Sequence, residues 1–145
     1  MEDVRATQSY REVHECLAAA LRQQGVSAVT KTIDAADDAA SAGSGLPGVC
    51  FERAERYDVV HAETGEKIAG AAQKRNKRGL LFQGSLWRPA LRITLDGDKL
   101  LEDFTVELAR ALQTVAEPSP WPEFNEEEVS GLTETYSSVE WIEAR

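Results

Sequence analysis

The sequence lacks a long apolar run. No stretch reaches the roughly 18 apolar residues that a membrane-spanning helix needs, and the first residues are too polar for a signal peptide. Only two cysteines occur, Cys16 and Cys50, which are too few for a disulfide framework. We therefore expect a cytoplasmic protein that works under reducing conditions and has no membrane partner.

The recognised motifs of nucleotide and metal sites are also missing. Neither GxxxxGKS/T nor GxGxxG, the glycine-rich loops that hold nucleotide phosphates, occurs. The two histidines, His14 and His61, are not arranged with other ligands at the spacing of a zinc site. A formal net charge of −9 argues against a general nucleic-acid-binding protein, because such proteins bind by neutralising phosphates. We expect no metal, no tightly bound cofactor and no nucleic-acid partner.

The composition that is present is that of a folded domain. The chain has 145 residues, of which 42% are hydrophobic and 28% charged, so it can bury a core, and we assign residues 1–145 to one domain. Its charge is uneven, with seven Lys or Arg against two acids over residues 61–92, and eight acids against Arg145 from residue 117 onward. This basic island predicts an anionic ligand or an acidic partner, and a solvated turn with ordinary surface charges is the alternative.

Hydrophobic periodicity predicts the order of the elements. A helix is expected over residues 10–24, because Ser9 and Glu12 have the spacing of a capping box and Gly25 is a typical C-terminal stop. Residues 34–48 contain few large apolar side chains and are expected to form a loop. Alternating or β-rich segments predict strands over residues 26–33, 57–62, 66–74, 80–87 and 91–95.

Two further helices are expected after these strands. The first covers residues 98–116, and the second is capped by Asn125. The first should present one apolar face, formed by Leu101, Phe104, Leu108, Leu112 and Val115. The whole order predicts an α/β domain of the α+β type, in which helices cover a mostly antiparallel mixed sheet.

One strand carries the strongest candidate for chemistry. Lys67 stands at the head of the small-residue run Ile68-Ala69-Gly70-Ala71-Ala72. Alanine and glycine pack little surface in a strand, which indicates that something approaches the backbone closely. A lysine there can meet a carbonyl or phosphate oxygen as a point charge, and the alternative is a solvent-facing lysine. We predict that Lys67 is catalytic and that the substrate-binding residues are Gly70, Ala71, Ala72, Gln83, Gly84 and Ser85.

Cys50 is the second candidate, at the end of the predicted loop. Its thiol can act as a nucleophile if a nearby cation or helix dipole lowers its pKa. An inert, partly buried cysteine is the alternative, and spacing alone leaves both interpretations open. Cys16 lies beside Leu17 in the first predicted helix and is expected to pack in the core.

Several of these segments together resemble the lipoate–protein ligase and octanoyltransferase family. The resemblance covers most of the chain in consistent order, and its KIAGxAQ and GLLxQGS segments are specific. It is carried by Cys50-Phe51, Tyr57-Asp58-Val59, Lys67-Ile68-Ala69-Gly70-Ala71-Ala72-Gln73, Gly79-Leu80-Leu81, Gln83-Gly84-Ser85 and the ending Tyr136-Ser137-Ser138-Val139-Glu140-Trp141.

The resemblance implies roles for both candidates. The lysine matching Lys67 contacts the activated acyl carbonyl, and also the phosphate of lipoyl-AMP where the enzyme is a ligase. The cysteine matching Cys50 forms an acyl-thioester in octanoyltransferases, which take the acyl group from an acyl carrier protein. Such enzymes transfer octanoyl or lipoyl groups to a lysine of a lipoyl carrier domain. An ATP-dependent ligase, using ATP and magnesium, is the alternative.

Two departures from the family pattern qualify this expectation. Family members generally begin with strands bearing an Arg-Arg-x-x-Gly-Gly type motif, which this sequence does not contain before Tyr10. A histidine is common where Phe82 stands, and phenylalanine can neither donate a hydrogen bond nor titrate. The chain is therefore expected to be the second half of a catalytic domain. Three alternatives stay open: one subunit of a split enzyme that a partner completes, a truncated part of a longer chain, or a non-catalytic binding relative that has lost half of the active site.

Overall fold

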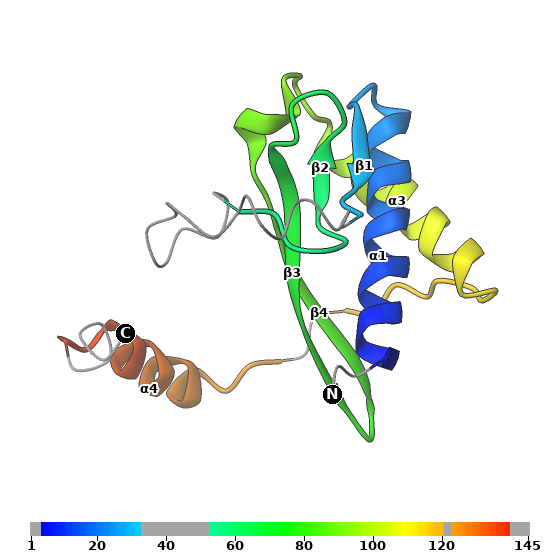
Figure 1. The fold of residues 1–145 in the computed structure, drawn as a ribbon. Helices are drawn as coiled ribbons and strands as arrows, with labels where there is room; N and C mark the ends of the chain where they lie inside the picture. The colour runs from blue at the N-terminus through cyan, green and yellow to red at the C-terminus, as the bar shows by residue number, and fades with distance from the viewer. Residues whose placement is uncertain (1–3, 33–52, 121–122, 140–145) are drawn as a thin grey trace.

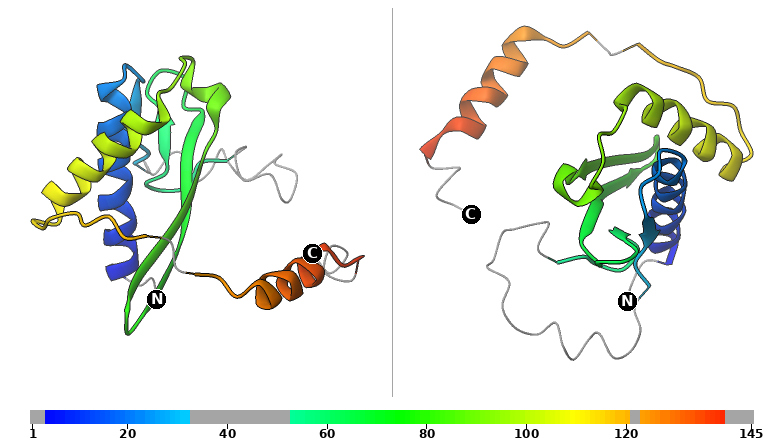
Figure 2. Two further views of the ribbon diagram at one scale, coloured as in Figure 1. Left: turned by 180° about the vertical axis from the view of Figure 1, so that it is seen from behind. Right: turned by 90° about the horizontal axis from the view of Figure 1, so that it is seen from above.

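The computed structural model describes residues 4–32, 53–120 and 123–139, and it has an α+β fold (Figure 1). Its centre is a four-stranded antiparallel sheet in the order β1 (Ala28–Thr30), β2 (Val59–His61), β3 (Lys67–Asn76) and β4 (Gly79–Leu86). Helices α1 (Val4–Gln23) and α3 (Gly97–Ala111) lie on the same side of this sheet (Figure 2). The predicted fold class is confirmed.

Helix α1 begins earlier than predicted. It starts at Val4, so Ser9 lies inside the helix, where its hydroxyl donates to the backbone oxygen of Arg5 at 2.9 Å. The predicted capping box of Ser9 and Glu12 is therefore wrong, because the helix already supplies hydrogen-bond partners at these positions. The C-terminal stop is confirmed, since the helix ends at Gln23 and Gly25, two residues later, adopts a positive φ of 87°.

Strands β3 and β4 form a long hairpin that extends past the N-terminal end of α1 (Figure 1). The register runs from Ala69 opposite Leu86 to Asn76 opposite Gly79, which leaves two residues in the turn. The Asn76 side-chain oxygen accepts the N–H groups of Arg78 at 2.8 Å and Gly79 at 3.2 Å, so the turn is held by its own side chain. The sequence-based hairpin is confirmed within a few residues.

The strand predicted over residues 91–95 is wrong. The chain forms a short 3-10 helix, η1 (Arg88–Leu91), with Pro89 in its first turn. Arg92 follows in the left-handed region, with a φ of 59°, which ends the helix and prevents extended pairing. The alternation of apolar side chains arises because Leu91 is buried and Leu95 packs against the core from a non-strand backbone.

Helix α3 is shorter than predicted and buries a different face. It ends at Ala111, and its buried residues are Leu100 and Asp103, with Phe104 packed against the core. The predicted face is wrong in part, because the Leu101 side chain is 65% exposed and Leu112 lies beyond the helix. The fully buried centre lies between α1, the sheet and η1, and includes Leu21, Val59, Ile68 and Leu91.

Helix α4 (Glu126–Ser137) begins where predicted. The Asn125 side chain accepts the N–H groups of Glu127 at 2.9 Å and Glu128 at 3.2 Å, which confirms the cap. None of its residues is buried. In the described parts of the chain, no helix has both the length and the apolar character required to cross a membrane.

Candidate functional site

Lys67 is held by a buried carboxylate. The residue opens β3, and its ammonium nitrogen lies 2.8 Å from Oδ2 of Asp58. The exposed fractions of the two side chains are 11% for Lys67 and 1% for Asp58. The alternative of a solvent-facing strand lysine is therefore wrong. An ammonium group carries three N–H donors, so the contact with Asp58 is compatible with a second contact to a ligand oxygen.

Asp58 has partners on both oxygens. Oδ1 accepts the hydroxyl of Tyr10 at 2.5 Å, and Oδ2 also accepts the backbone N–H of Glu55 at 2.8 Å. A buried carboxylate is costly unless it is paired and hydrogen-bonded, and here both conditions are met. The contacts fix the Asp58 carboxylate, and through it the Lys67 ammonium.

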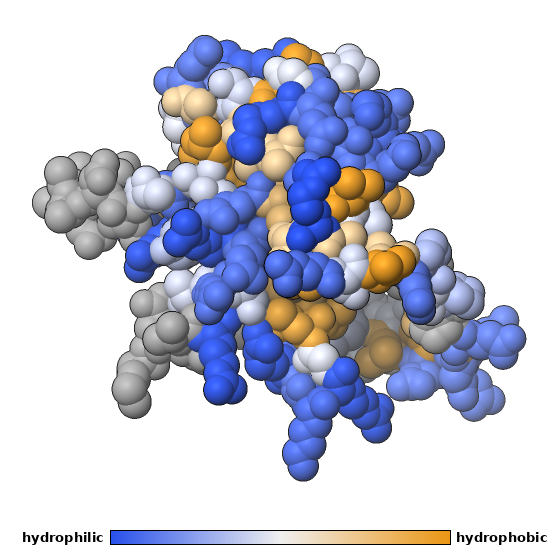
Figure 3. Space-filling view, turned by 90° about the vertical axis from the view of Figure 1, so that its right-hand side faces the viewer, coloured by the Kyte–Doolittle hydropathy of each residue, from blue (hydrophilic) through white to orange (hydrophobic). Residues whose placement is uncertain are grey.

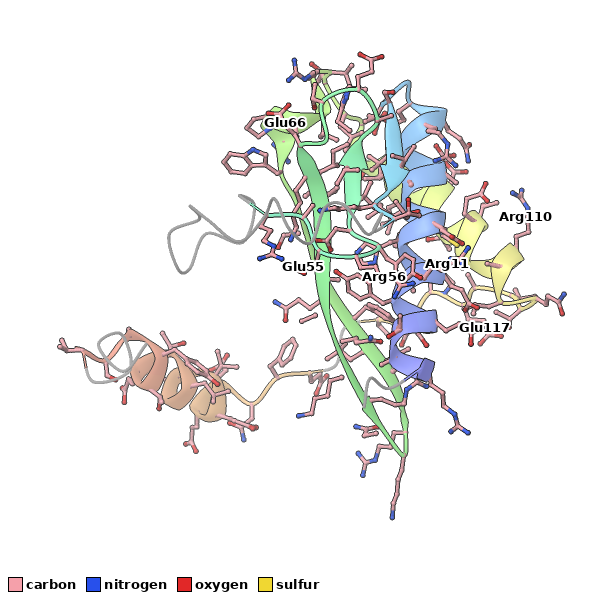
Figure 4. All side chains as sticks on the ribbon, in the orientation of Figure 1. Arg11, Glu55, Arg56, Glu66, Arg110 and Glu117 are labelled. Atoms are coloured by element: carbon pink, nitrogen blue, oxygen red, sulfur yellow. The ribbon has the colours of Figure 1, made fainter. Side chains whose placement is uncertain are left out.

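The backbone before Asp58 is unusual. Tyr57 adopts a positive φ of 68°, which is rare for a non-glycine residue. Its ring lies against two guanidinium groups, with Arg56 at 4.7 Å and Arg11 at 5.7 Å from the ring centroid. Figure 4 shows Arg11 of α1 and Arg56 of the segment before β2 next to each other. These contacts hold the turn that directs the Asp58 carboxylate towards Lys67.

Tyr10 connects the helix to the strand. Its hydroxyl donates to Asp58 and accepts the backbone N–H of Ala71 at 3.1 Å. Burial of the hydroxyl, and then its hydrogen bond to Asp58, raises the pKa of Tyr10 to about 12. The phenol therefore stays protonated near neutral pH and keeps donating to the carboxylate.

Gly70 explains why the strand is built from small residues. A Cβ atom added at Gly70 would lie 2.8 Å from Cε and 2.9 Å from Nζ of Lys67, and 3.0 Å from Oδ1 of Asp58. The space of a side chain is thus occupied by the ion pair. The sequence correctly indicates a close approach to this backbone, but the group that approaches is the protein's own lysine.

An apolar groove runs beside this network. Its volume is about 580 Å³, within the range of small-molecule sites, and it lies between α1, α3, η1 and the two long strands. On the side of the molecule where α1 and α3 lie, hydrophobic surface appears in patches between hydrophilic side chains (Figure 3). The walls include Leu17, Phe82, Leu86, Leu100 and Phe104.

Four of the six predicted substrate-binding residues line this groove. These are Gly70, Ala71, Gly84 and Ser85. The other two, Ala72 and Gln83, face each other across β3 and β4, are exposed and do not line it. Cys50 and its neighbour Phe51 lie outside the described residues. Lys67 itself does not line the groove, and of the predicted binding set the structure places Gly70 against its side chain.

His14 also lines the groove and was not predicted as a site residue. Its Nδ1 lies 2.8 Å from the backbone oxygen of Tyr10, and since a carbonyl only accepts, Nδ1 carries the proton. Burial lowers the pKa of His14, so its neutral form is favoured. The signal available in the sequence is its position next to Val13 on the buried side of α1, which by itself does not distinguish a site from a core.

The arrangement suits chemistry at a carbonyl or phosphate group. A cation held rigidly at low solvent exposure stabilises negative charge on a nearby oxygen more strongly than it would in water. The groove beside it is apolar and accepts a hydrophobic chain. In the described ranges, no group of three or more potential metal ligands occurs.

Comparison with known proteins identifies the class. No family model matches the chain. The chain is 33% identical over 98 residues to the octanoyltransferase LipM of Lysinibacillus sphaericus (strain C3-41), a match that spans 68% of this chain and 33% of that protein. Its fold resembles lipoate–protein ligase A bound with ATP, with a TM-score of 0.58 and 18% identity. It also resembles a T. acidophilum protein assigned as a lipoate protein ligase with bound lipoic acid, with a TM-score of 0.56 and 18% identity.

The fold is thus that of a lipoate–protein ligase domain. The chain belongs to the lipoate–protein ligase and octanoyltransferase family, as the resemblance in its sequence predicted. The chain spans about a third of the octanoyltransferase that it matches, and 60% of each of the two solved ligase chains. Its likeness to these two solved structures is a likeness of fold alone.

Proposed function

We propose that the chain is a component of an octanoyl- or lipoyl-transfer enzyme. Lys67 and the groove form one wall of its acyl site, and the acceptor is a lysine of a lipoyl carrier domain. The observation that carries this proposal is the Lys67 ammonium, fixed at 2.8 Å from a buried Asp58 and packed against Gly70 at the groove wall. Membership of the family supplies the class of reaction.

In the proposed reaction, the Cys50 thiolate attacks the carbonyl carbon of an octanoyl thioester carried by an acyl carrier protein. The carbon–sulfur bond to the carrier breaks, and the carrier thiol takes up the proton that Cys50 lost. The amine of the acceptor lysine then attacks the Cys50 thioester, forms an amide and returns a proton to the cysteine sulfur. Both steps exchange acyl groups without ATP.

Lys67 acts in both steps. Negative charge develops on the carbonyl oxygen as each tetrahedral intermediate forms, and the fixed ammonium stabilises it. The loss of one such donor typically costs about 10²–10³-fold in rate. Asp58 and Tyr10 hold the ammonium in place and do not themselves touch the acyl group.

A ligase reaction is the second candidate, favoured by the folds of the two solved ligase neighbours. There Lys67 would contact the carbonyl and phosphate of lipoyl-AMP, formed from ATP with magnesium. The octanoyltransferase reaction is preferred because Cys50-Phe51 matches the nucleophile position of that branch and the matched curated relative is an octanoyltransferase.

A partner subunit is proposed to supply the rest of the acyl site. Strand β4 is an edge of the sheet among the described residues, and an exposed strand edge offers unpaired backbone groups to another chain. A relative that binds a carrier without chemistry is the competing interpretation. The octanoyl adduct described next separates the two, because a pure binding protein forms none.

The proposal is tested by intact-mass spectrometry. The chain, alone and co-purified with candidate partner subunits, is incubated with octanoyl–acyl carrier protein. We expect one octanoyl adduct on Cys50, which Cys50→Ser abolishes, while the matched control Cys16→Ser keeps it. If the Cys50→Ser variant still transfers the acyl group and this transfer depends on ATP, the reaction is that of a ligase and not that of a transferase. A complete, folded enzyme with neither adduct nor transfer would refute both.

A further inference from the structure

We propose that the tip of the β3–β4 hairpin is the docking surface for an acidic carrier domain. The basic tip is defined as residues 74–78, with the sequence Lys-Arg-Asn-Lys-Arg. This inference rests on the proposed function, because that function requires a carrier domain to present its lysine at the acyl site. It adds where on the molecule the carrier binds and which charge its surface has.

The basic tip is a defined structure that projects into solvent. All five residues are exposed. They lie at the end of the hairpin that extends past the N-terminal end of α1 (Figure 1). The turn is fixed by the Asn76 side chain. One member is also anchored to the body, since the Arg75 guanidinium donates to the Ser9 hydroxyl at 2.7 Å. The backbone that carries these charges, and the Arg75 guanidinium, therefore have defined positions.

In the part of the chain that the structure describes, none of the cations of the tip is paired with an acidic side chain, whereas several other exposed cations are. Four exposed arginines elsewhere, Arg11, Arg53, Arg92 and Arg110, each lie within 2.5–3.6 Å of a glutamate. The exposed Arg56 and Arg88 form no such pair among the described residues, but each stands singly in the sequence and not in a cluster. Among the described residues, no carboxylate forms an ion pair with any of the four cations of the tip. On a chain with a formal charge of −9, this concentration of unneutralised positive charge attracts an acidic partner.

The distance between the tip and Lys67 matches one small domain. Strand β3 runs from Lys67 to Asn76, and at about 3.4 Å per residue its ends are roughly 30 Å apart. A small folded domain is also about 30 Å across. A single carrier can therefore touch the tip while its acceptor lysine reaches the site at the other end of the strand.

An exposed apolar side chain completes the surface. Leu81 lies opposite Lys74 in the hairpin register and is 65% exposed. An apolar contact surrounded by charges is typical of a protein–protein interface. A nucleic acid or an anionic membrane fits less well, since the rest of this acidic chain repels an extended polyanion.

Binding to a purified apo lipoyl carrier domain of net negative charge tests the inference without relying on catalysis. Surface plasmon resonance compares the full chain with the triple variant Lys74→Glu, Lys77→Glu and Arg78→Glu. We expect the dissociation constant to rise about tenfold or more at low salt, and the difference to shrink at high salt. The matched control reverses Arg53, Arg92 and Arg110, which gives the same net charge. Circular dichroism checks the fold of both variants.

Binding of a carrier with reversed surface charge provides the decisive test. If lysines replace the acidic residues of the carrier, the triple variant should bind this carrier more tightly than the unaltered chain does. If the control variant weakens carrier binding as much as the triple variant does, the inference is overturned. It is also overturned if the triple variant binds the carrier as tightly as the unaltered chain does. Tip-dependent binding to RNA or anionic vesicles, without binding to the carrier, would overturn it as well. Carrier binding through the tip without acyl transfer would uphold the docking surface and count against the proposed function alone.

Discussion

Replacement of Gly70 by alanine tests the geometry of the lysine directly. The added methyl carbon would lie 2.8 Å from Cε of Lys67, whereas carbon atoms in contact are about 3.5 Å apart or more. The Lys67 side chain must therefore retreat by about 0.7 Å. It is the far end of a flexible side chain, so it moves more readily than backbone, but its ion pair with Asp58 is disturbed.

The expected magnitudes separate function from folding. Misplacement of a reacting or stabilising group by about 1 Å can cost about 10²-fold in rate, so we expect octanoyl transfer by the complete enzyme to fall by that order. Overpacking typically lowers the free energy of unfolding by about 1–3 kcal/mol, which leaves a stable domain folded. The variant should therefore be folded and slow.

Gly131→Ala is the matched control. A Cβ atom at Gly131 meets nothing within 4 Å, and the residue lies in α4, is exposed and does not line the groove. Transfer rates and urea unfolding curves are measured for the two variants and the unaltered chain. Near-normal transfer by Gly70→Ala would refute the reasoning that Lys67 works from its observed position. An equal loss in Gly131→Ala would point to a general sensitivity to alanine instead.

Three further predictions concern the groups around the site. Tyr10→Phe should lower the free energy of unfolding at neutral pH. The pKa of Tyr10 is about 12 in the folded state and 10.0 in the unfolded state, so the difference in the free energy of unfolding between the unaltered chain and Tyr10→Phe should shrink as the pH rises from 10 towards 12. A difference in urea melts that stays constant over this range would contradict the prediction. The lowered pKa of His14 should add stability above about pH 6.5 that is lost on acidification, and His14→Gln should remove that dependence. Ile68→Ala, at a fully buried position, should cost about 2–5 kcal/mol in urea melts.

The elements with clear local signals were predictable from the sequence. The hairpin followed from two β-rich segments around a polar turn, and Asn125 marked the start of the last helix. The start of α1 was missed because Ser9 and Glu12 have capping spacing although helical residues precede them. The strand over residues 91–95 failed because alternating burial also arises when Leu91 and Leu95 pack from an irregular backbone.

The site was predictable only where it is local in sequence. Lys67 and Gly70 stand three residues apart, so their association was visible as a lysine heading a small-residue strand. Asp58 and Tyr10 were missed because the contact between them spans 48 residues and depends on tertiary packing. Asp58 could have been suspected as a carboxylate directly before an apolar strand. The role of Cys50 stays a prediction.

The central claim is that the Lys67 ammonium stabilises the charge that develops on the acyl oxygen. Single-turnover transfer of an octanoyl group from acyl carrier protein to a lipoyl carrier domain, by the chain together with the partner subunit proposed above, measures this most directly. We predict that Lys67→Ala lowers this rate by about 10²–10³-fold while the unaltered circular dichroism spectrum shows an intact fold. A folded Lys67→Ala enzyme that transfers the octanoyl group at a near-normal rate would contradict the claim.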